Sequence, residues 1–125
     1  MTENKISYSI RGAIFEIYNA LGPGLLESVY SHMLAYELSE NGLFVEREVP
    51  VSVNYRDQQL DLGFRIDLLV EGKVLIELKS IDALHEVHHK QVLTYLKLTG
   101  YKLGLLVNFN TDDIAGSIIR KVNGL

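Results

Sequence analysis

Residues 67–79, Asp-Leu-Leu-Val-Glu-Gly-Lys-Val-Leu-Ile-Glu-Leu-Lys, are typical of two apolar strands joined by a tight turn, with charged residues inside both runs. Gly72 lies in the turn and can supply the left-handed backbone conformation that a short hairpin loop needs. A two-residue loop would put Asp67 and Glu77 on opposite faces, whereas a three-residue loop pairs position 67 with position 77. In the second register Asp67, Glu77 and Lys79 share one face, because alternate side chains of a strand point the same way.

Two carboxylates and an ammonium group would then converge on one patch of the hairpin. Adjacent carboxylates repel each other and lose hydration when buried unless a cation offsets their charge, so Asp67 and Glu77 form a candidate Mg²⁺ site. The alternative is a surface ion pair between Lys79 and either acid. Spacing alone leaves both interpretations open.

The rest of the chain alternates between helical and strand-like periodicity, without an internal repeat or a linker. The predicted helices cover 6–21, 25–40, 84–99 and a last segment from Asp112 or Asp113 to about Val122, and the predicted strands cover 44–55, 59–70, 73–79 and 103–109. The breaks between them are Gly22-Pro23-Gly24, Asn41-Gly42, Asp57-Gln58, Glu71-Gly72-Lys73 and Gly100. This order, helix-helix-strand-strand-strand-helix-strand-helix, predicts one α/β domain over 1–125, a mixed sheet of about four to five strands with helices on both faces.

One predicted helix carries a polar side chain among apolar ones. On helix 84–99, an advance of about 100° per residue places Gln91 in one narrow arc with Val87, Tyr95 and Leu98. A glutamine in an apolar arc is either a buried structural amide or a site residue.

The helix predicted at 25–40 has an apolar side that carries acids as well. The apolar residues expected on that side are Leu26, Val29, Tyr30, Met33 and Leu34. Glu27 lies beside them, but Glu37 falls in the same stripe. Position alone therefore does not make either glutamate functional.

Composition limits the class of protein. The chain has 125 residues, 47% of them hydrophobic, as expected for one folded domain. The absence of cysteine excludes disulfides, thiolate metal sites and a cysteine nucleophile, and it fits a cytoplasmic protein. No run approaches the roughly 18 consecutive apolar residues of a membrane span, and residues 1–12 lack the apolar core of a secretion signal.

Charge is distributed unevenly along the chain. The formal net charge of −4, from 12 Lys+Arg and 16 Asp+Glu, argues against a protein that coats nucleic acid but not against a nucleic-acid enzyme. Residues 1–84 carry 7 basic and 13 acidic side chains, and residues 85–125 carry 5 basic and 3 acidic ones. Either these charges form an ordinary solvated surface, or the acids gather around a metal while the C-terminal part meets an anion.

Residues 85–89, His-Glu-Val-His-His, satisfy the H-E-x-x-H pattern of zinc peptidases on a predicted helix. That chemistry needs a third protein ligand, and no histidine follows His89 and no glutamate follows Glu86. A zinc peptidase is therefore a remote alternative. We expect His88, His89 and Lys90 on a solvated helix face or on a partly basic surface near nucleic acid.

The charged hairpin resembles a known enzyme signature. Asp67 followed by Glu77-x-Lys79 is similar to the motif of the PD-(D/E)xK nuclease superfamily. Ile66 stands where the motif has proline, a departure that leaves the metal ligand intact.

Two further motifs agree with this resemblance. Gln91-Val-Leu-Thr-Tyr95 resembles the QxxxY motif on the helix that follows in many members. Gly24-Leu-Leu-Glu27-Ser-Val-Tyr30 resembles the motif that names a small bacterial family of the superfamily, the GxxExxY proteins. With all three motifs in order, the resemblance covers nearly the whole chain.

The resemblance implies a restriction-endonuclease-like fold and a nuclease that uses Mg²⁺ or Mn²⁺ to hydrolyse phosphodiester bonds. Asp67 and Glu77 would hold the metal, with the backbone carbonyl of Leu78 as a third oxygen. Glu27 would add a ligand or a water contact from the helix side. Lys79 would orient or activate the attacking water and stabilise negative charge in the transition state.

The resemblance also implies supporting residues and a partner. Gln91 would position the water or the lysine, and Tyr95 would support the site or contact phosphate. The partner would be nucleic acid, DNA rather than RNA, with no membrane involved. A homodimer is compatible with so small a nuclease core, although no sequence feature demands it. The competing hypothesis is a non-catalytic nucleic-acid- or protein-binding module that retains the fold, against which the intact acidic residues argue.

Overall fold

The computed structural model describes residues 1–125, except for the side chain of Leu62. The helices and strands follow the chain as α1 (Glu3–Leu21), α2 (Glu27–Glu40), β1 (Val45–Tyr55), β2 (Gln58–Val70), β3 (Val74–Lys79), α3 (Glu86–Thr99), β4 (Leu103–Asn108), a 3-10 turn η1 (Ala115–Ser117) and β5 (Ile118–Val122). The predicted order is confirmed up to β4. Among the described helices, none combines the length and the apolar character needed to cross a membrane.

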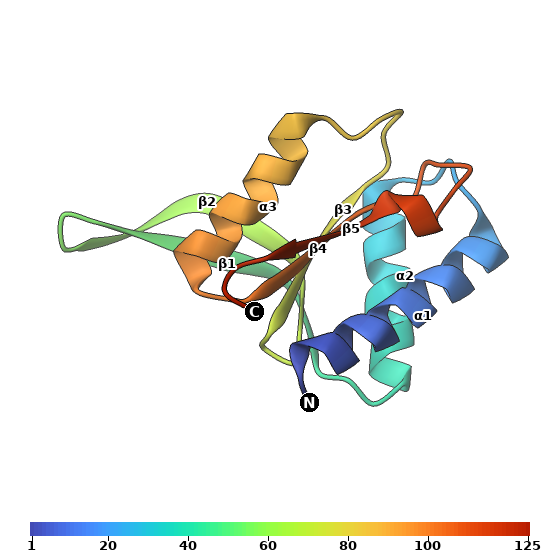
Figure 1. Ribbon diagram of the computed structural model, residues 1–125, viewed down its shortest axis with the longest axis horizontal. Helices are drawn as coiled ribbons and strands as arrows, with labels where there is room; N and C mark the ends of the chain where they lie inside the picture. The colour runs from blue at the N-terminus through green and yellow to red at the C-terminus, as the bar shows by residue number, and fades with distance from the viewer.

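The strands form one mixed sheet of five strands in the spatial order β1-β2-β3-β4-β5. Neighbouring strands are antiparallel except β3 and β4, which are parallel and are connected through α3. Helices α1 and α2 cover one face of the sheet and α3 covers the other (Figure 1). The predicted α/β class, with a mixed sheet flanked by helices, is confirmed, and the architecture is that of a restriction-endonuclease-like core.

The two central strands supply an apolar core on each face of the sheet. Nearly every residue of β3 and β4 is buried, as expected for a parallel pair covered on both sides. Ile76 and Leu105 belong to the core beneath α1 and α2. Leu75 and Leu106 belong to the second core, where they meet Val92 of α3. The strand pair that carries the charged hairpin is therefore held from both sides.

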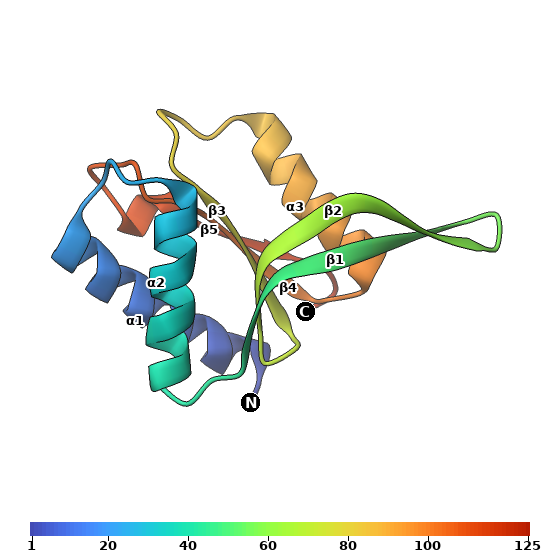
Figure 2. The same cartoon turned by 180° about the vertical axis from the view of Figure 1, so that it is seen from behind.

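Strands β1 and β2 continue beyond the helices as a long hairpin that projects from the body (Figure 2). Its tip is a two-residue turn at Arg56 and Asp57, with φ of 50° and 63°, which pairs Tyr55 with Gln58. The predicted turn at Asp57-Gln58 is therefore displaced by one residue.

The C-terminal segment is not the helix that its sequence predicts. Asp113 does begin a turn, because its Oδ1 accepts a hydrogen bond from Gly116 N at 3.2 Å, but the helical conformation ends with η1. Ile118 and Ile119 then enter β5, which pairs antiparallel with β4. The free edge of β4 offers backbone partners, and β-branched side chains favour a strand. Tertiary pairing therefore overrides the helix predicted to about Val122.

The buried side of α2 also differs from the prediction. Tyr30 and Leu34 are buried as expected, but Val29 and Met33 are exposed, and Leu26 is 73% exposed. Apolar residues surround much of this helix, so periodicity cannot tell which half meets the sheet.

Helix α3 is rotated relative to the predicted arc. Its buried residues are Val92, Tyr95 and Leu96, whereas Val87 is 65% exposed. Gln91 is half-buried at the edge of the packed face. This position suits a polar side chain that faces a site better than a fully buried amide.

Gly104 of β4 shows how closely α3 packs on that strand, and Gly12 of α1 serves as the comparison. A Cβ at Gly104 would lie 2.9 Å from Val92 Cγ1, whereas a Cβ at Gly12 of α1 would meet nothing within 4 Å. Gly104→Ala should lower the free energy of unfolding by about 1–3 kcal/mol, because the β-branched Val92 yields poorly. Gly12→Ala should raise it by about 0.5–1 kcal/mol through helix propensity. Urea denaturation measures both changes, and a shift in the same direction for both variants would contradict this packing.

Candidate active site

Strands β2 and β3 pair for only a short distance and then separate. The pairs are Leu68 with Ile76, Leu69 with Leu75 and Val70 with Val74, which is the register of a three-residue loop. One step further along this register, position 67 faces position 77. The loop geometry that brings the two acids to one face is thus the one that forms. Beyond this point β2 stays paired with β1 but leaves β3, so the acids lie at a fork in the sheet.

At the fork, two carboxylates take the place of the strand ladder. Glu77 Oε1 accepts a hydrogen bond from the backbone N–H of Asp67 at 3.2 Å. Asp67 Oδ2 accepts one from the backbone N–H of Leu78 at 2.7 Å. Each carboxylate satisfies an N–H group that the separating strands would otherwise leave unpaired. The backbone thereby fixes the positions of both acids.

Burial makes this pair of acids resist ionisation. Glu77 is only 4% exposed, and its burial, with repulsion from Asp67, raises the pKa of Glu77 to about 8. Burial also raises the pKa of Asp67, although the hydrogen bond from Leu78 opposes the shift. Adjacent buried carboxylates of this kind are neutralised by protons or by a hard cation such as Mg²⁺, whose preferred ligands are oxygens. The donor chemistry therefore fits a divalent metal.

Lys79 lies near both acids without forming an ion pair with them. It stands two residues after Glu77 on β3, and its charge lowers the pKa of Asp67 and of Glu77. Among the described side chains, the ion pairs are Arg65–Asp61 at 3.2 Å and Lys90–Glu86 at 3.5 Å. The alternative of a simple surface ion pair at Lys79 is thus not what forms. Its side chain lines a hollow together with His88 and Gln91 of α3.

Helix α3 brings Gln91 and Tyr95 to the same region. Their spacing of four residues places them on one side of the helix, and Gln91 Nε2 donates a hydrogen bond to Tyr95 Oη at 3.2 Å. The Tyr95 ring is buried, with its centroid 6.0 Å from that of Phe64 on β2. Burial raises the pKa of Tyr95, and the charges of Glu77 and Asp67 raise it further. The predicted pair therefore lies beside the acids, with Tyr95 anchored in the core.

The loop between α1 and α2 positions Glu27. Tyr30 Oη donates a hydrogen bond to the Gly22 carbonyl at 2.6 Å and accepts one from the Leu25 N–H at 3.2 Å. The Tyr30 ring stacks on Phe109 at a centroid distance of 4.2 Å. A single buried tyrosine thus closes the loop and places Glu27 in the first turn of α2.

Two more contacts connect this loop to the fork. Gly24 has φ of 100°, a conformation that side-chain-bearing residues rarely adopt. Ser80 Oγ, one residue after Lys79, donates a hydrogen bond to the Leu25 carbonyl. Glu27 is exposed, and its charge raises the pKa of Asp67 and of Glu77. It lies on the rim of the site rather than between the two acids.

Glu48 of β1 is a site residue that sequence reasoning missed. It lines a hollow of about 220 Å³ with Glu27 and Asp67, and its charge raises the pKa of Asp67. Its backbone has φ of 54°, although it stands in a strand. Nothing in the spacing of β1 marks this residue, because a glutamate at that place of an alternating strand is ordinary. The positive φ is the signal, since such strain collects at functional sites.

The metal-binding potential of the site rests on a pair of acids, not on a larger cluster. Within the described residues, no three His, Cys, Asp or Glu side chains are close enough together to hold an ion. A cation such as Mg²⁺ suits this arrangement, because it keeps several waters and needs only one or two carboxylates. Leu78 contributes its N–H to Asp67. Its carbonyl as a ligand stays a prediction.

The H-E-x-x-H residues are used differently from those of a zinc peptidase. His85 caps the start of α3, and its backbone N–H donates to Nδ1 of His88 at 2.9 Å. Glu86 pairs with Lys90, and His89 lines a separate cavity. These histidines therefore form a helix start rather than a metal centre.

Comparison with known proteins agrees with this arrangement. The sequence model of the PD-(D/E)XK nuclease superfamily matches residues 4–121. The chain belongs to this superfamily. No curated protein and no solved structure gives a significant match. Membership of the PD-(D/E)XK superfamily, expected from the three motifs, is thus confirmed over nearly the whole chain.

The raised pKa of Glu77 predicts that stability depends on pH. As the pH rises from the ordinary value of 4.5 to about 8, the unfolded chain loses this proton while the folded protein keeps it. Without divalent cations, the folded protein therefore loses stability across this range. Glu77→Gln lacks the titration, so it should be more stable than wild type above about pH 8, on the order of a few kcal/mol. Below about pH 4 the two should be equal. Urea denaturation in EDTA measures the free energy of unfolding of both proteins at each pH. A difference between them that does not depend on pH would show that the titration of Glu77 is not its cause.

The strained backbone of Glu48 predicts an unusual response to glycine. Glu48→Gly should raise the free energy of unfolding by about 1 kcal/mol, because glycine adopts a positive φ without steric penalty. Glu46→Gly on the same strand should lower it by about 0.5–1 kcal/mol, since no strain is relieved there. Thermal denaturation compares the two variants, and equal destabilisation would show that Glu48 is not strained.

Proposed function

We propose that this protein is a metal-dependent nuclease that hydrolyses phosphodiester bonds at the fork between β2 and β3. The observation that carries the proposal is the buried pair of carboxylates, Asp67 and Glu77, beside Lys79. Its membership of the PD-(D/E)XK nuclease superfamily supports a nuclease-type activity. Buried acids that favour their protonated forms are a costly arrangement for a protein whose only task is to fold, and a cation removes that cost.

Asp67 and Glu77 would hold Mg²⁺, or Mn²⁺ in its place. Glu27 on the rim would add a ligand or a water contact, and the Leu78 carbonyl would supply a third oxygen. A bound ion of this kind supplies Lewis acidity toward phosphate oxygens and offsets the charge of the two carboxylates. The chain's own contribution is to fix both acids through backbone N–H groups, so that little reorganisation is needed.

Lys79 and α3 would complete the reaction site. The ammonium group of Lys79 would orient or activate the attacking water and stabilise negative charge that develops on the phosphate. Gln91 lines the same hollow and would position that water or Lys79. Tyr95 would support the site indirectly, because its hydroxyl accepts the hydrogen bond that orients the Gln91 amide.

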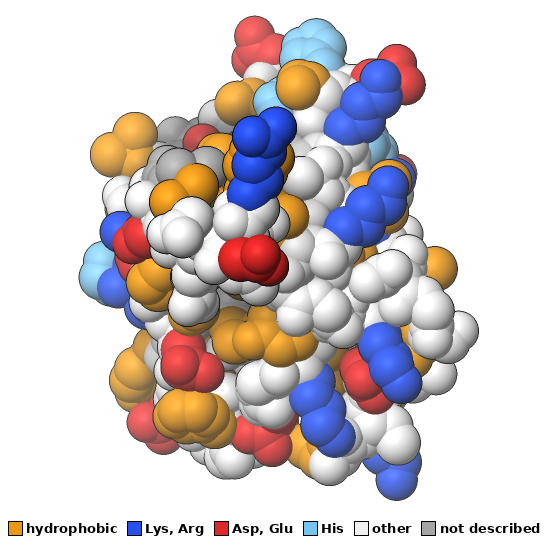
Figure 3. Space-filling model, turned by 90° about the vertical axis from the view of Figure 1, so that its left-hand side faces the viewer, with side chains coloured by type: hydrophobic (Ala, Val, Ile, Leu, Met, Phe, Trp, Pro, Cys, Tyr) orange, Lys and Arg blue, Asp and Glu red, His pale blue; other side chains and the backbone are white. Residues whose placement is uncertain are grey.

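The partner would be nucleic acid, and we favour DNA over RNA. Lys and Arg side chains gather on one side of the face that presents the projecting hairpin (Figure 3). The exposed lysines of the chain include Lys90 and Lys97 of α3 and Lys102 after it. With an overall charge of −4, contact with phosphate would be local rather than spread over the surface. A cytoplasmic location would fit this activity.

We also infer that the chain belongs to the bacterial GxxExxY group within the superfamily. Gly24, Glu27 and Tyr30 support this assignment, because each has a distinct physical task in one loop. Gly24 adopts the positive φ, Tyr30 closes the loop, and Glu27 starts the helix next to the acids.

The proposed activity predicts that Lys79 is needed for cleavage but not for metal binding, whereas Asp67 is needed for both. Purified protein should cleave at least one of single- or double-stranded DNA or RNA when Mg²⁺ or Mn²⁺ is present. Lys79→Ala should lower kcat by roughly 100-fold or more and yet retain Mg²⁺ binding in calorimetry. Asp67→Ala should lose both properties.

The matched control is Lys73→Ala, an exposed lysine just before the same strand, which should leave kcat unchanged. If wild type and Lys79→Ala behave alike on every substrate, the catalytic proposal is wrong.

A further inference from the structure

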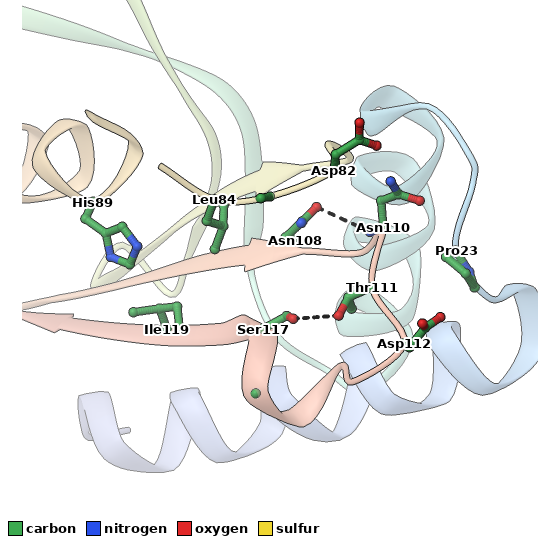
Figure 4. Close-up of a pocket in the computed structure, with 12 residues that line it drawn as sticks. Pro23, Asp82, Leu84, His89, Asn108, Asn110, Thr111, Asp112, Ser117 and Ile119 are labelled. Atoms are coloured by element: carbon green, nitrogen blue, oxygen red, sulfur yellow. Dashed lines mark hydrogen bonds between the residues drawn. The ribbon is translucent and has the colours of Figure 1, made fainter. Parts of the chain in front are cut away.

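A second cavity, of about 610 Å³, lies beyond the fork and includes none of its acids (Figure 4). It opens where the parallel strands β3 and β4 end. The chain leaves β3 toward α3 on one face of the sheet. It leaves β4 through Thr111, which binds Tyr18 of α1, and Ile114, which joins the core beneath α1 on the other face. Crevices of this kind, at the carboxyl ends of parallel strands whose connections diverge, are the preferred ligand sites of α/β sheets.

The walls of this cavity are held in place by hydrogen bonds. The buried Asn108 accepts a hydrogen bond from the Ile81 N–H at 3.1 Å and donates one to the Ile81 carbonyl at 2.9 Å. Ser117 Oγ donates to Thr111 Oγ1 at 2.9 Å, and the Tyr18 hydroxyl donates to the Thr111 carbonyl. Both connecting loops are thus tied to the sheet or to α1. The cavity is therefore largely preformed, as ligand pockets usually are.

One end of the cavity is apolar and carries an imidazole. Leu84 lies on one side and Ile119 of β5 on the other, and the His89 ring points toward Ile119 (Figure 4). Leu84 and Ile119 both pack against the core beneath α3, so this end offers an aliphatic wall on which the face of a flat ring can rest, with the imidazole beside it.

The other end of the cavity presents hydrogen-bond acceptors. Asp82, Asn110 and Asp112 line it, the first after β3 and the other two after β4 (Figure 4). Among the described lining residues there is neither lysine nor arginine, and two carboxylates repel an anion. A phosphate is therefore a poor fit. A metal ion is also a poor fit, because Asp82 and Asp112 are exposed and hydrated, so unlike the buried acids of the fork they need no cation to offset their charge.

The cavity is connected to the fork by a series of hollows around the start of α3. His88 lines both the hollow at Lys79 and a second hollow beside it. Asp82 and Ala83 line that second hollow and the cavity. Lys79 and Asp82 are three positions apart, so their Cα atoms are separated by at most about 11 Å. A short stretch of nucleic-acid strand would bridge this distance.

We propose that this cavity binds one unpaired nucleobase of the strand that the fork would cleave. Leu84 and Ile119 would contact one face of the base. A carboxylate at the other end, Asp82 or Asp112, would accept a hydrogen bond from its exocyclic amino group, as carboxylates do with the amino group of cytosine. The site would therefore prefer cytosine, adenine and guanine to thymine and uracil, which lack an exocyclic amino group. The role in cleavage rests on the proposed nuclease function, but base binding itself needs neither metal nor Lys79.

The experiment is an NMR titration of the full ¹⁵N-labelled chain in EDTA with cytidine, adenosine, guanosine, thymidine and inorganic phosphate. Cytidine and the purine nucleosides should shift the backbone amides of residues 81–84, 108–112 and 116–119. The double variant Asp82→Asn/Asp112→Asn should bind cytidine at least about tenfold more weakly, because charge-assisted hydrogen bonds are lost. Both aspartates are exposed, so these isosteric changes spare the core. Asp57→Asn, at the hairpin tip, is the matched control and should bind cytidine as wild type does.

Three results would overturn the base-binding site: no shift with any nucleoside, shifts that the double variant leaves equally strong, or equal shifts with phosphate alone. The outcome is separable from that of the nuclease proposal. A protein that binds nucleosides here but cleaves nothing supports the subsite and defeats only the catalytic proposal. A protein that cleaves nucleic acid and binds no nucleoside here defeats only the subsite.

Discussion

The structure depends on two hydrogen bonds from backbone N–H groups to carboxylates, at the point where β2 separates from β3. Glu77 accepts the N–H of Asp67, and Asp67 accepts the N–H of Leu78, so the acids replace the ladder that the separating strands lose. A sheet can open in this way only if the exposed backbone groups find other partners. The same two hydrogen bonds satisfy the backbone at the fork and fix the positions of both carboxylates. The opening of the sheet and the chemistry of the site therefore depend on the same contacts.

The site is assembled from both helical layers, which is why the rest of the fold is needed. On one side, Tyr30 and Ser80 hold the loop before α2 against the end of β3 and bring Glu27 to the rim. On the other side, α3 packs into the second core and carries Gln91 and Tyr95 toward the acids. Stability supplied by the two cores offsets the unfavourable burial of the acids and the strained backbone of Glu48. The overall charge of −4 thus conceals a local concentration of acids that would be balanced where a cation binds.

Much of the site could be predicted because its determinants are local. Gly72 and its neighbours set the loop length, and the loop length decides that Asp67 and Glu77 meet. The spacing of four between Gln91 and Tyr95 implies contact on any helix. Glu48 could not be found in this way, because its positive φ and its place beside Asp67 in one hollow arise only in the folded hairpin of β1 and β2.

The sequence by itself therefore determined the α/β class and the ends of the helices at Gly22 and Gly100, and it limited the charged hairpin to two registers. These follow from backbone conformation and from periodicities of a few residues. The tertiary structure alone decided that residues 118–122 form a strand, because the open edge of β4 competes successfully with local helix signals. It also decided which half of α2 is buried and where the second cavity opens. Both depend on surfaces contributed by segments far apart in the chain, which no local pattern encodes.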